Sequence, residues 1–184
     1  MRKLQTSLAA ASAILILASA AGAQTASNGG AVPGGFSQQF LGQFNSSMSK
    51  FIALAEAMPA EKFSWSPGPG VMSVAKVYAH VAHYNYRYPS QNMGIGLPAG
   101  IELDKLEATA AKAEVVNLLK QSGDFVRRAV AQTPDAQLAA QTRLYGDNVQ
   151  KWAVLLQLLA HMNEHLGQSI AYARMNNVVP PWSR

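Results

Sequence analysis

The sequence predicts an all-α fold, a four-helix bundle, and two observations support this. Amphipathic helical patterns recur in separate segments from about residue 36 onward. No segment shows a convincing alternation of apolar and polar residues, which would indicate a strand. Elements of this one kind are expected to bury their apolar stripes against one another. We therefore expect a single helical domain over residues 36–184.

The first segment, residues 1–23, has the features of a cleavable signal peptide. A basic start with Arg2 and Lys3 is followed by an apolar run over residues 8–20 and by the small residues Ala21-Gly22-Ala23. The run is shorter than the roughly 20 residues that a membrane span requires. Cleavage would leave 184 − 23 = 161 residues. We expect a soluble protein, periplasmic or secreted, with no stable membrane insertion and, because no cysteine lies at the cleavage site, no lipid anchor.

The following segment, residues 24–35, is rich in Gly, Ser and Ala and is expected to be a flexible lead-in to the domain. The formal net charge of +5 falls to +3 once Arg2 and Lys3 are removed, and the remaining basic residues are scattered. Nucleic-acid binding is therefore not expected. The chain contains no cysteine, so disulfides and thiolate ligands are excluded, and any metal must be held by His, Asp or Glu.

The first predicted helix begins at Phe36 and approaches its end at Pro59, with apolar residues on one face. These are Phe40, Phe44, Phe51 and Ala55. After a Pro- and Gly-rich connection over residues 64–70, Ser73 is a good N-cap for a second helix that ends at about Tyr88.

A long loop over residues 89–100 separates the second helix from the third, which ends before Pro134. The third helix is patterned by Val115, Leu118, Leu119, Val126 and Val130, with Gly123 as an unfavourable interior residue. A polar turn over residues 146–148 precedes the fourth helix. Its apolar residues include Trp152, Leu155, Leu156, Leu159, Leu166 and Ile170.

The four histidines of the chain all lie in the second and fourth predicted helices: His80, His83, His161 and His165. His161 and His165 are four residues apart, so they share one stripe of the helix, together with Gln168. Two such imidazoles and a third from a facing helix would form a three-histidine site with an open position, as catalytic zinc uses. The alternative is that the pair consists of hydrogen-bonded polar residues at the edge of the core.

His80 and His83 compete for the third ligand position. On a helical wheel His80 lies roughly 85° from the centre of the apolar face and His83 roughly 145°. His80 is therefore the better inward candidate, and His83 is expected at the solvated surface. Glu164 completes the pattern H-x-x-E-H of inverted zinc proteases, in which it would be the general base. That site needs a further ligand far downstream, and only 19 residues follow His165. On the helical wheel Glu164 lies roughly 60° from His161 on the polar side, so we expect a surface residue, and a base acting on metal-bound water is the alternative.

Two runs together carry a family resemblance. SVAKVYAHVAHYNY, residues 73–86, and HMNEHLGQSIAYARMNNVVPPW, residues 161–182, resemble the DinB/YfiT-like family of metal-dependent enzymes. In that family the ligands are a histidine seven residues after a helix-capping serine and an H-x-x-x-H pair followed by Gly-Gln. The resemblance implies His80, His161 and His165 as ligands of a divalent metal ion, with Gly167 and Gln168 flanking the site. Zn²⁺ is the expected ion, and Ni²⁺ and Fe²⁺ are alternatives.

The resemblance also implies a four-helix bundle that is often a homodimer. Some members are thiol-dependent transferases or isomerases, which implies a small-molecule substrate and a low-molecular-weight thiol as co-substrate. The signal peptide departs from those cytosolic enzymes. Our first hypothesis is an exported metal-dependent transferase or hydrolase, with no residue assigned as catalytic. The alternatives are a non-catalytic metal- or ligand-binding bundle acting in envelope stress, and a helical protein that binds no metal.

Overall fold

The structure of the chain is a computed structural model that describes residues 35–183. The predicted signal peptide and all but the last residue of the lead-in lie outside the described residues. The described chain is mostly helical, and its longest helices are α1 (Phe36–Ala57), α2 (Val74–Arg87), α4 (Lys112–Ala131) and α6 (Lys151–Met175). Shorter elements connect them: η1 (Ala60–Lys62), η2 (Tyr88–Asn92), α3 (Leu103–Leu106), α5 (Asp135–Leu138), β1 (Gln141–Leu144), β2 (Asp147–Gln150) and η3 (Pro181–Ser183).

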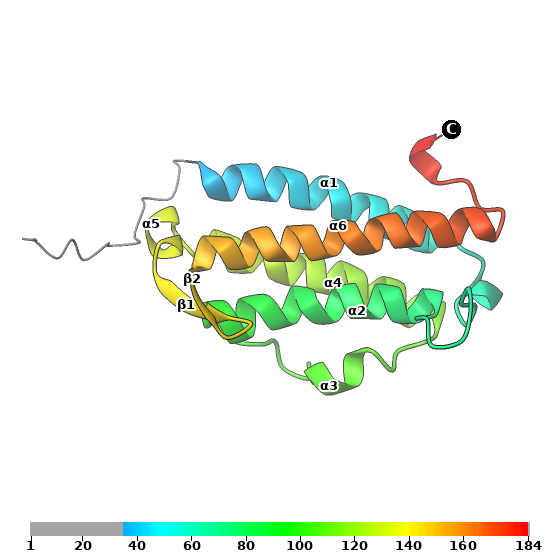
Figure 1. Cartoon of the computed structure of the whole chain (residues 1–184), viewed down its shortest axis with the longest axis horizontal. Helices are drawn as coiled ribbons and strands as arrows, with labels where there is room; N and C mark the ends of the chain where they lie inside the picture. The colour runs from blue at the N-terminus through cyan, green and yellow to red at the C-terminus, as the bar shows by residue number, and fades with distance from the viewer. Residues whose placement is uncertain (1–34, 184) are drawn as a thin grey trace, which may run out of the picture.

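The long helices run side by side along the length of the molecule (Figure 1). α2 packs against α4 and α6, and α1 packs against the same two helices. Each long helix therefore has two long neighbours, and their apolar faces meet in one core. Among the helices described, none is both long enough and apolar enough to span a bilayer.

The apolar faces predicted from periodicity form this core. Phe44, Phe51 and Ala55 of α1 are fully buried, and Phe40 is nearly so. The predicted apolar residues of α4 are buried as well: Val115, Leu118, Leu119, Val126 and Val130. On α6, Leu155 and Leu166 are buried but Leu156 is 52% exposed, so the buried stripe is narrower than the run of leucines.

The start of α2 has the cap that the sequence predicts. The Ser73 hydroxyl accepts a hydrogen bond from the backbone N–H of Lys76, at 3.2 Å. This bond satisfies one of the backbone donors that the first turn of a helix leaves without a partner. α1 starts differently, because the carboxylate of Asp135 accepts from the backbone N–H groups of Gly35 and Ser37.

The expectation that no strands would be present is wrong. β1 and β2 form an antiparallel hairpin, with Gln141 opposite Gln150 and Leu144 opposite Asp147. Each strand has only four residues, which is too short for a clear alternation. The turn residues Tyr145 and Gly146 both have positive φ, 53° and 97°, as a type I′ turn requires. The usual Asn-Gly or Asp-Gly signal for such a turn is missing, so the hairpin was not apparent from sequence.

The segment predicted as a loop over residues 89–100 is also partly helical. Its first residues continue α2 as the π-helical turn η2, which contains Pro89. The hairpin is attached to this turn through Asn92: its side chain donates to the Arg143 carbonyl, and its own carbonyl accepts from the Thr142 hydroxyl. η2 and the hairpin therefore form one connected layer at the end of α2.

Candidate metal centre

Helices α2 and α6 bring three histidines together: His80, His161 and His165. One ring nitrogen from each lies within 4.8 Å of the others. The Nε2 atoms of His80 and His161 are 3.2 Å apart. The ring of His165 lies 4.9 Å from that of His80 and 4.6 Å from that of His161, centre to centre. The three imidazoles therefore face a common point between the two helices.

The spacing suits ligands of one metal ion. Two nitrogens bound to a tetrahedral Zn²⁺ at about 2.0–2.1 Å are separated by about 3.3 Å. The 3.2 Å between the Nε2 atoms of His80 and His161 agrees with this value. A set of imidazole nitrogens is also suitable for Cu, Ni or Fe, so the donors select a class of divalent ions and not one metal.

The electrostatic surroundings keep the imidazoles of His80 and His161 neutral. Burial, together with the neighbouring His165 and His80, lowers the pKa of His161 to about 3. Burial also lowers the pKa of His80, while its hydrogen bond to the Glu107 carboxylate opposes that shift. Since only a neutral imidazole has a free lone pair for a metal, both groups are in the binding form at neutral pH.

Two of the histidines have partners on their outer ring nitrogens. The Nδ1 atom of His80 lies 2.7 Å from Oε1 of Glu107, which follows α3. The Nδ1 atom of His165 lies 2.8 Å from Oε1 of Gln168, one turn further along α6. The Nε2 atom of His80 is the one that faces His161 in the cluster.

The other residues considered from sequence lie outside the cluster. His83 is partly buried, not at the solvated surface as expected, and its Nδ1 lies 2.9 Å from the Leu103 carbonyl oxygen. Glu164 is exposed, in agreement with the wheel. Gly167 is exposed, and a Cβ built on it would meet no atom within 4 Å.

Sequence reasoning did not associate Glu107 or Tyr84 with the site. The ring of Tyr84 lies 4.3 Å from that of His161 and 4.8 Å from that of His80. The i, i+4 spacing of His80 and Tyr84 could have indicated this contact. Glu107 follows His80 by 27 residues on a short segment with no periodic signal, so nothing in the sequence indicates its position.

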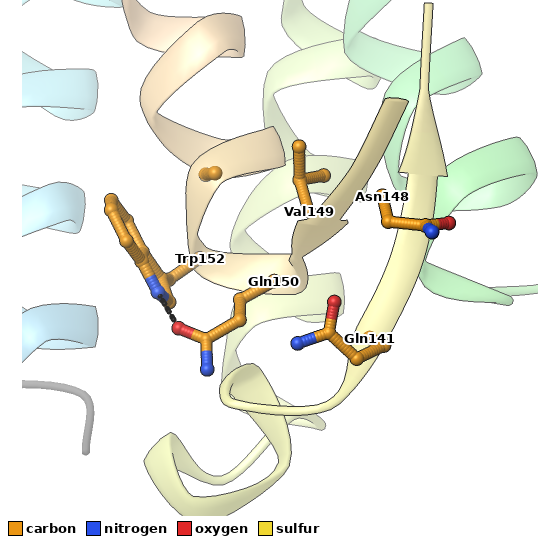
Figure 2. A pocket seen from close by; sticks show the side chains of 6 residues that line it. Gln141, Asn148, Val149, Gln150 and Trp152 are labelled. Carbon is orange, nitrogen blue, oxygen red and sulfur yellow. Dashed lines mark hydrogen bonds between the residues drawn. The ribbon is translucent and has the colours of Figure 1, made fainter. Parts of the chain in front are cut away.

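A further pocket lies at the start of α6, beside the hairpin (Figure 2). Its lining is amide and apolar and has no titratable side chain: Gln141, Asn148, Val149, Gln150, Trp152 and Ala153. The indole N–H of Trp152 donates to Oε1 of Gln150 in this wall. None of the clustered histidines lines this pocket. The residues that could hold a metal ion therefore lie in the cluster and not in this pocket.

The fold and the cluster define a class of protein: a helical domain in which histidines from two helices could hold a metal ion. The sequence identifies the family, because residues 43–172 match the DinB superfamily. The chain belongs to this superfamily.

The fold agrees with solved structures. A DinB-like protein from Bacillus cereus ATCC 10987 is 16% identical with a TM-score of 0.66, and the match covers 80% of this chain and 94% of that one. A conserved protein from Enterococcus faecalis is 16% identical with a TM-score of 0.60, and the match covers 75% and 95%. At this identity the likeness concerns the fold alone. A comparison with curated proteins gives no match.

Proposed function

We propose that this chain is an exported four-helix bundle that binds one divalent metal ion through His80, His161 and His165. In this proposal it acts as a metal-dependent transferase or hydrolase on a small molecule. The observation that carries the proposal is the convergence of three ring nitrogens within 4.8 Å, with two of them separated by 3.2 Å. Zn²⁺ is the expected ion, because three-histidine sites with an open position are typical of catalytic zinc.

The protein's own contribution is to hold three neutral donors that leave the double positive charge of the ion uncompensated. When bound, such an ion lowers the pKa of a coordinated water or thiol and polarises an oxygen of the substrate. The ring of Tyr84 packs against His161 and His80, which limits the directions from which a substrate can approach. The Tyr84 hydroxyl accepts a hydrogen bond from Arg87 at 3.3 Å, and this contact holds the ring in place.

An activity screen tests the catalytic part of the proposal. Protein loaded with zinc is assayed for conjugation of low-molecular-weight thiols and for hydrolysis of small esters and amides. The His161→Ala variant, once circular dichroism has shown that it is folded, is the control, since it lacks one proposed ligand. We expect metal-dependent turnover in at least one assay that His161→Ala lacks. Equal activity in the metal-loaded protein and in the variant would contradict the proposal.

One observation favours the second candidate function, a non-catalytic metal- or ligand-binding bundle acting in envelope stress. Among residues 35–183, the carboxylate in contact with a clustered histidine is that of Glu107, and it already forms a hydrogen bond to His80. A general base needs a free acceptor near the reacting proton. Tight metal binding without turnover in any of the assays would support this candidate.

The proposed export rests on the sequence of residues 1–23. Protein recovered from the cell envelope or the medium should have the mass of a chain that begins at Gln24, without lipid. A full-length cytosolic species as the sole product would refute this part of the proposal.

We also propose a homodimer, on the basis of the family resemblance. Light scattering should give twice the mass of the chain, and a monomer at micromolar concentration would contradict this.

A further inference from the structure

The proton positions at the cluster can be worked out from groups that only accept hydrogen bonds. On the α2 side, Nδ1 of His80 lies 2.7 Å from the carboxylate of Glu107. An ionised carboxylate has no hydrogen to donate, so Nδ1 of His80 carries the proton. The Nε2 atom is then a bare lone pair, and it is this atom that lies 3.2 Å from Nε2 of His161.

On the α6 side a chain of hydrogen bonds ends at a backbone carbonyl. The Tyr172 hydroxyl donates to the carbonyl oxygen of Met72 at 3.2 Å, because a carbonyl can only accept. The Tyr172 oxygen accepts from the Gln168 amide N–H at 2.9 Å. The Gln168 amide oxygen is therefore directed at Nδ1 of His165, 2.8 Å away, and accepts its proton. His165, like His80, is left with a bare Nε2.

Both partners are held in position by the surrounding structure. Glu107 directly follows α3, and His83 on α2 bonds the Leu103 carbonyl at the first residue of that helix, at 2.9 Å. The two histidines of α2 therefore attach the α3 segment at both ends. Tyr172 is 6% exposed, and its ring packs edge-on against Trp65 at 5.3 Å. Neither the Glu107 contact nor the Gln168 contact therefore depends on a freely rotating surface side chain.

We propose that Glu107 and Gln168 are positioning residues that fix Nε2 as the ligating atom of His80 and His165. This inference rests on the proposed metal site. The two residues act differently. Glu107 adds a negative charge that makes the His80 imidazole a stronger donor, as in carboxylate–histidine–zinc arrangements. Gln168 is neutral and only orients the His165 ring. Its own orientation is fixed by its hydrogen bond to Tyr172.

The test measures Zn²⁺ affinity of the full chain at neutral pH by competition with a chromophoric chelator. Removing such a partner typically weakens metal binding about 10- to 100-fold. We expect a loss in this range for Glu107→Ala and for Gln168→Ala. Glu107→Gln keeps an acceptor of the same shape but loses the charge, so we expect a smaller loss. Because glutamine is nearly isosteric with glutamate, the Zn²⁺ affinity of Glu107→Gln tests the role of Glu107 even if Glu107→Ala does not fold.

Glu164→Gln is the matched control. Glu164 is an exposed carboxylate on α6 between His161 and His165, so its removal changes the charge equally without touching an imidazole. We expect its Zn²⁺ affinity to stay within about twofold of the wild type, as is usual for an exposed charge. A loss as large as that in Glu107→Gln would mean that overall charge, and not positioning, sets the affinity, and would overturn the inference.

A second readout reports the tautomers directly. Long-range ¹H–¹⁵N NMR spectra of the zinc-loaded protein should show protonated Nδ1 at His80 and His165. In Glu107→Ala the His80 Nδ1 proton should exchange faster with water, while that of His165 is unchanged. Gln168→Ala should show the reverse, which a general loss of stability would not produce.

The outcomes separate this inference from the function on which it rests. If the wild-type protein binds no zinc, the proposed function and the inference both fail. If the wild type binds zinc and His161→Ala does not, while Glu107→Ala and Gln168→Ala bind as tightly as the wild type, only the inference fails.

Discussion

Replacing each histidine in turn is the most informative perturbation of this protein. His80, His161 and His165 each offer one ring nitrogen to the cluster, and these nitrogens lie within 4.8 Å of one another. The loss of any one leaves two donors. Since loss of an outer-shell partner alone costs about 10- to 100-fold in metal affinity, loss of a direct ligand should cost at least about 100-fold. This corresponds to about 2.7 kcal/mol of binding free energy.

His83→Ala is the matched control for this series, because it removes the same side chain from the same helix as His80→Ala. Nδ1 of His83 lies 2.9 Å from the Leu103 carbonyl and is not part of the cluster. Its replacement should therefore change Zn²⁺ affinity only a few-fold, through a looser α3 segment. The four alanine variants are titrated with Zn²⁺ and with Ni²⁺ at neutral pH, after circular dichroism has shown that each is folded. Lost binding in His83→Ala with retained binding in His80→Ala would refute the assignment of ligands.

Three further predictions concern stability. Burial lowers the pKa of His161 to about 3 from an ordinary value of 6.5, so between these values the unfolded state binds a proton that the folded state does not. The free energy of unfolding of the metal-free protein should therefore fall as the pH falls through this window, by up to about 1.4 kcal/mol per pH unit, reduced by partial exposure, and this group should have no effect above the window. Urea unfolding at pH 5 and pH 7 should show a smaller loss of stability in His161→Gln than in the wild type. An equal loss in both proteins would refute His161 as the cause. Gly123→Ala gains about 1 kcal/mol in helix propensity, but its Cβ would lie 3.2 Å from the terminal carbon of buried Met48. We therefore expect a net change in stability below about 1 kcal/mol. Stabilisation by the full amount in thermal unfolding would show that the Met48 side chain moves aside without cost. Asn85→Ala removes the amide N–H that donates to the hydroxyl of buried Ser122 at 3.1 Å, and should destabilise the fold by about 1–3 kcal/mol in urea unfolding. An unchanged stability would mean that water replaces the amide.

Much of the helical architecture follows from sequence, because amphipathic periodicity directly reflects which face is buried. The phenylalanines of α1 and the Ser73 cap of α2 are both where the pattern predicts them. The hairpin is not predictable in this way. Its strands are four residues long, and its turn is formed by Tyr145-Gly146, where a tyrosine adopts a conformation that is unusual for a residue with a side chain.

The site divides in a similar way. The position of His80, His161 and His165 on facing stripes follows from helical spacing, so their proximity could be predicted once the helices were known to pack together. The partner of His80 could not be predicted, because Glu107 lies on a separate segment, directly after the short helix α3. The prediction that His83 lies at the solvated surface was wrong for the same reason, because the α3 segment covers a face of α2 that the helical wheel assigned to solvent.

The measurement that tests the central claim most directly is the metal content of the protein. The chain is purified without a histidine tag, stripped with a chelator, reconstituted with Zn²⁺ and dialysed, and its zinc is then measured by elemental analysis. A three-histidine site predicts one ion per chain in the wild type and far less in His161→Ala. A content far below one ion per chain in the wild type, or the same content in both proteins, would contradict it.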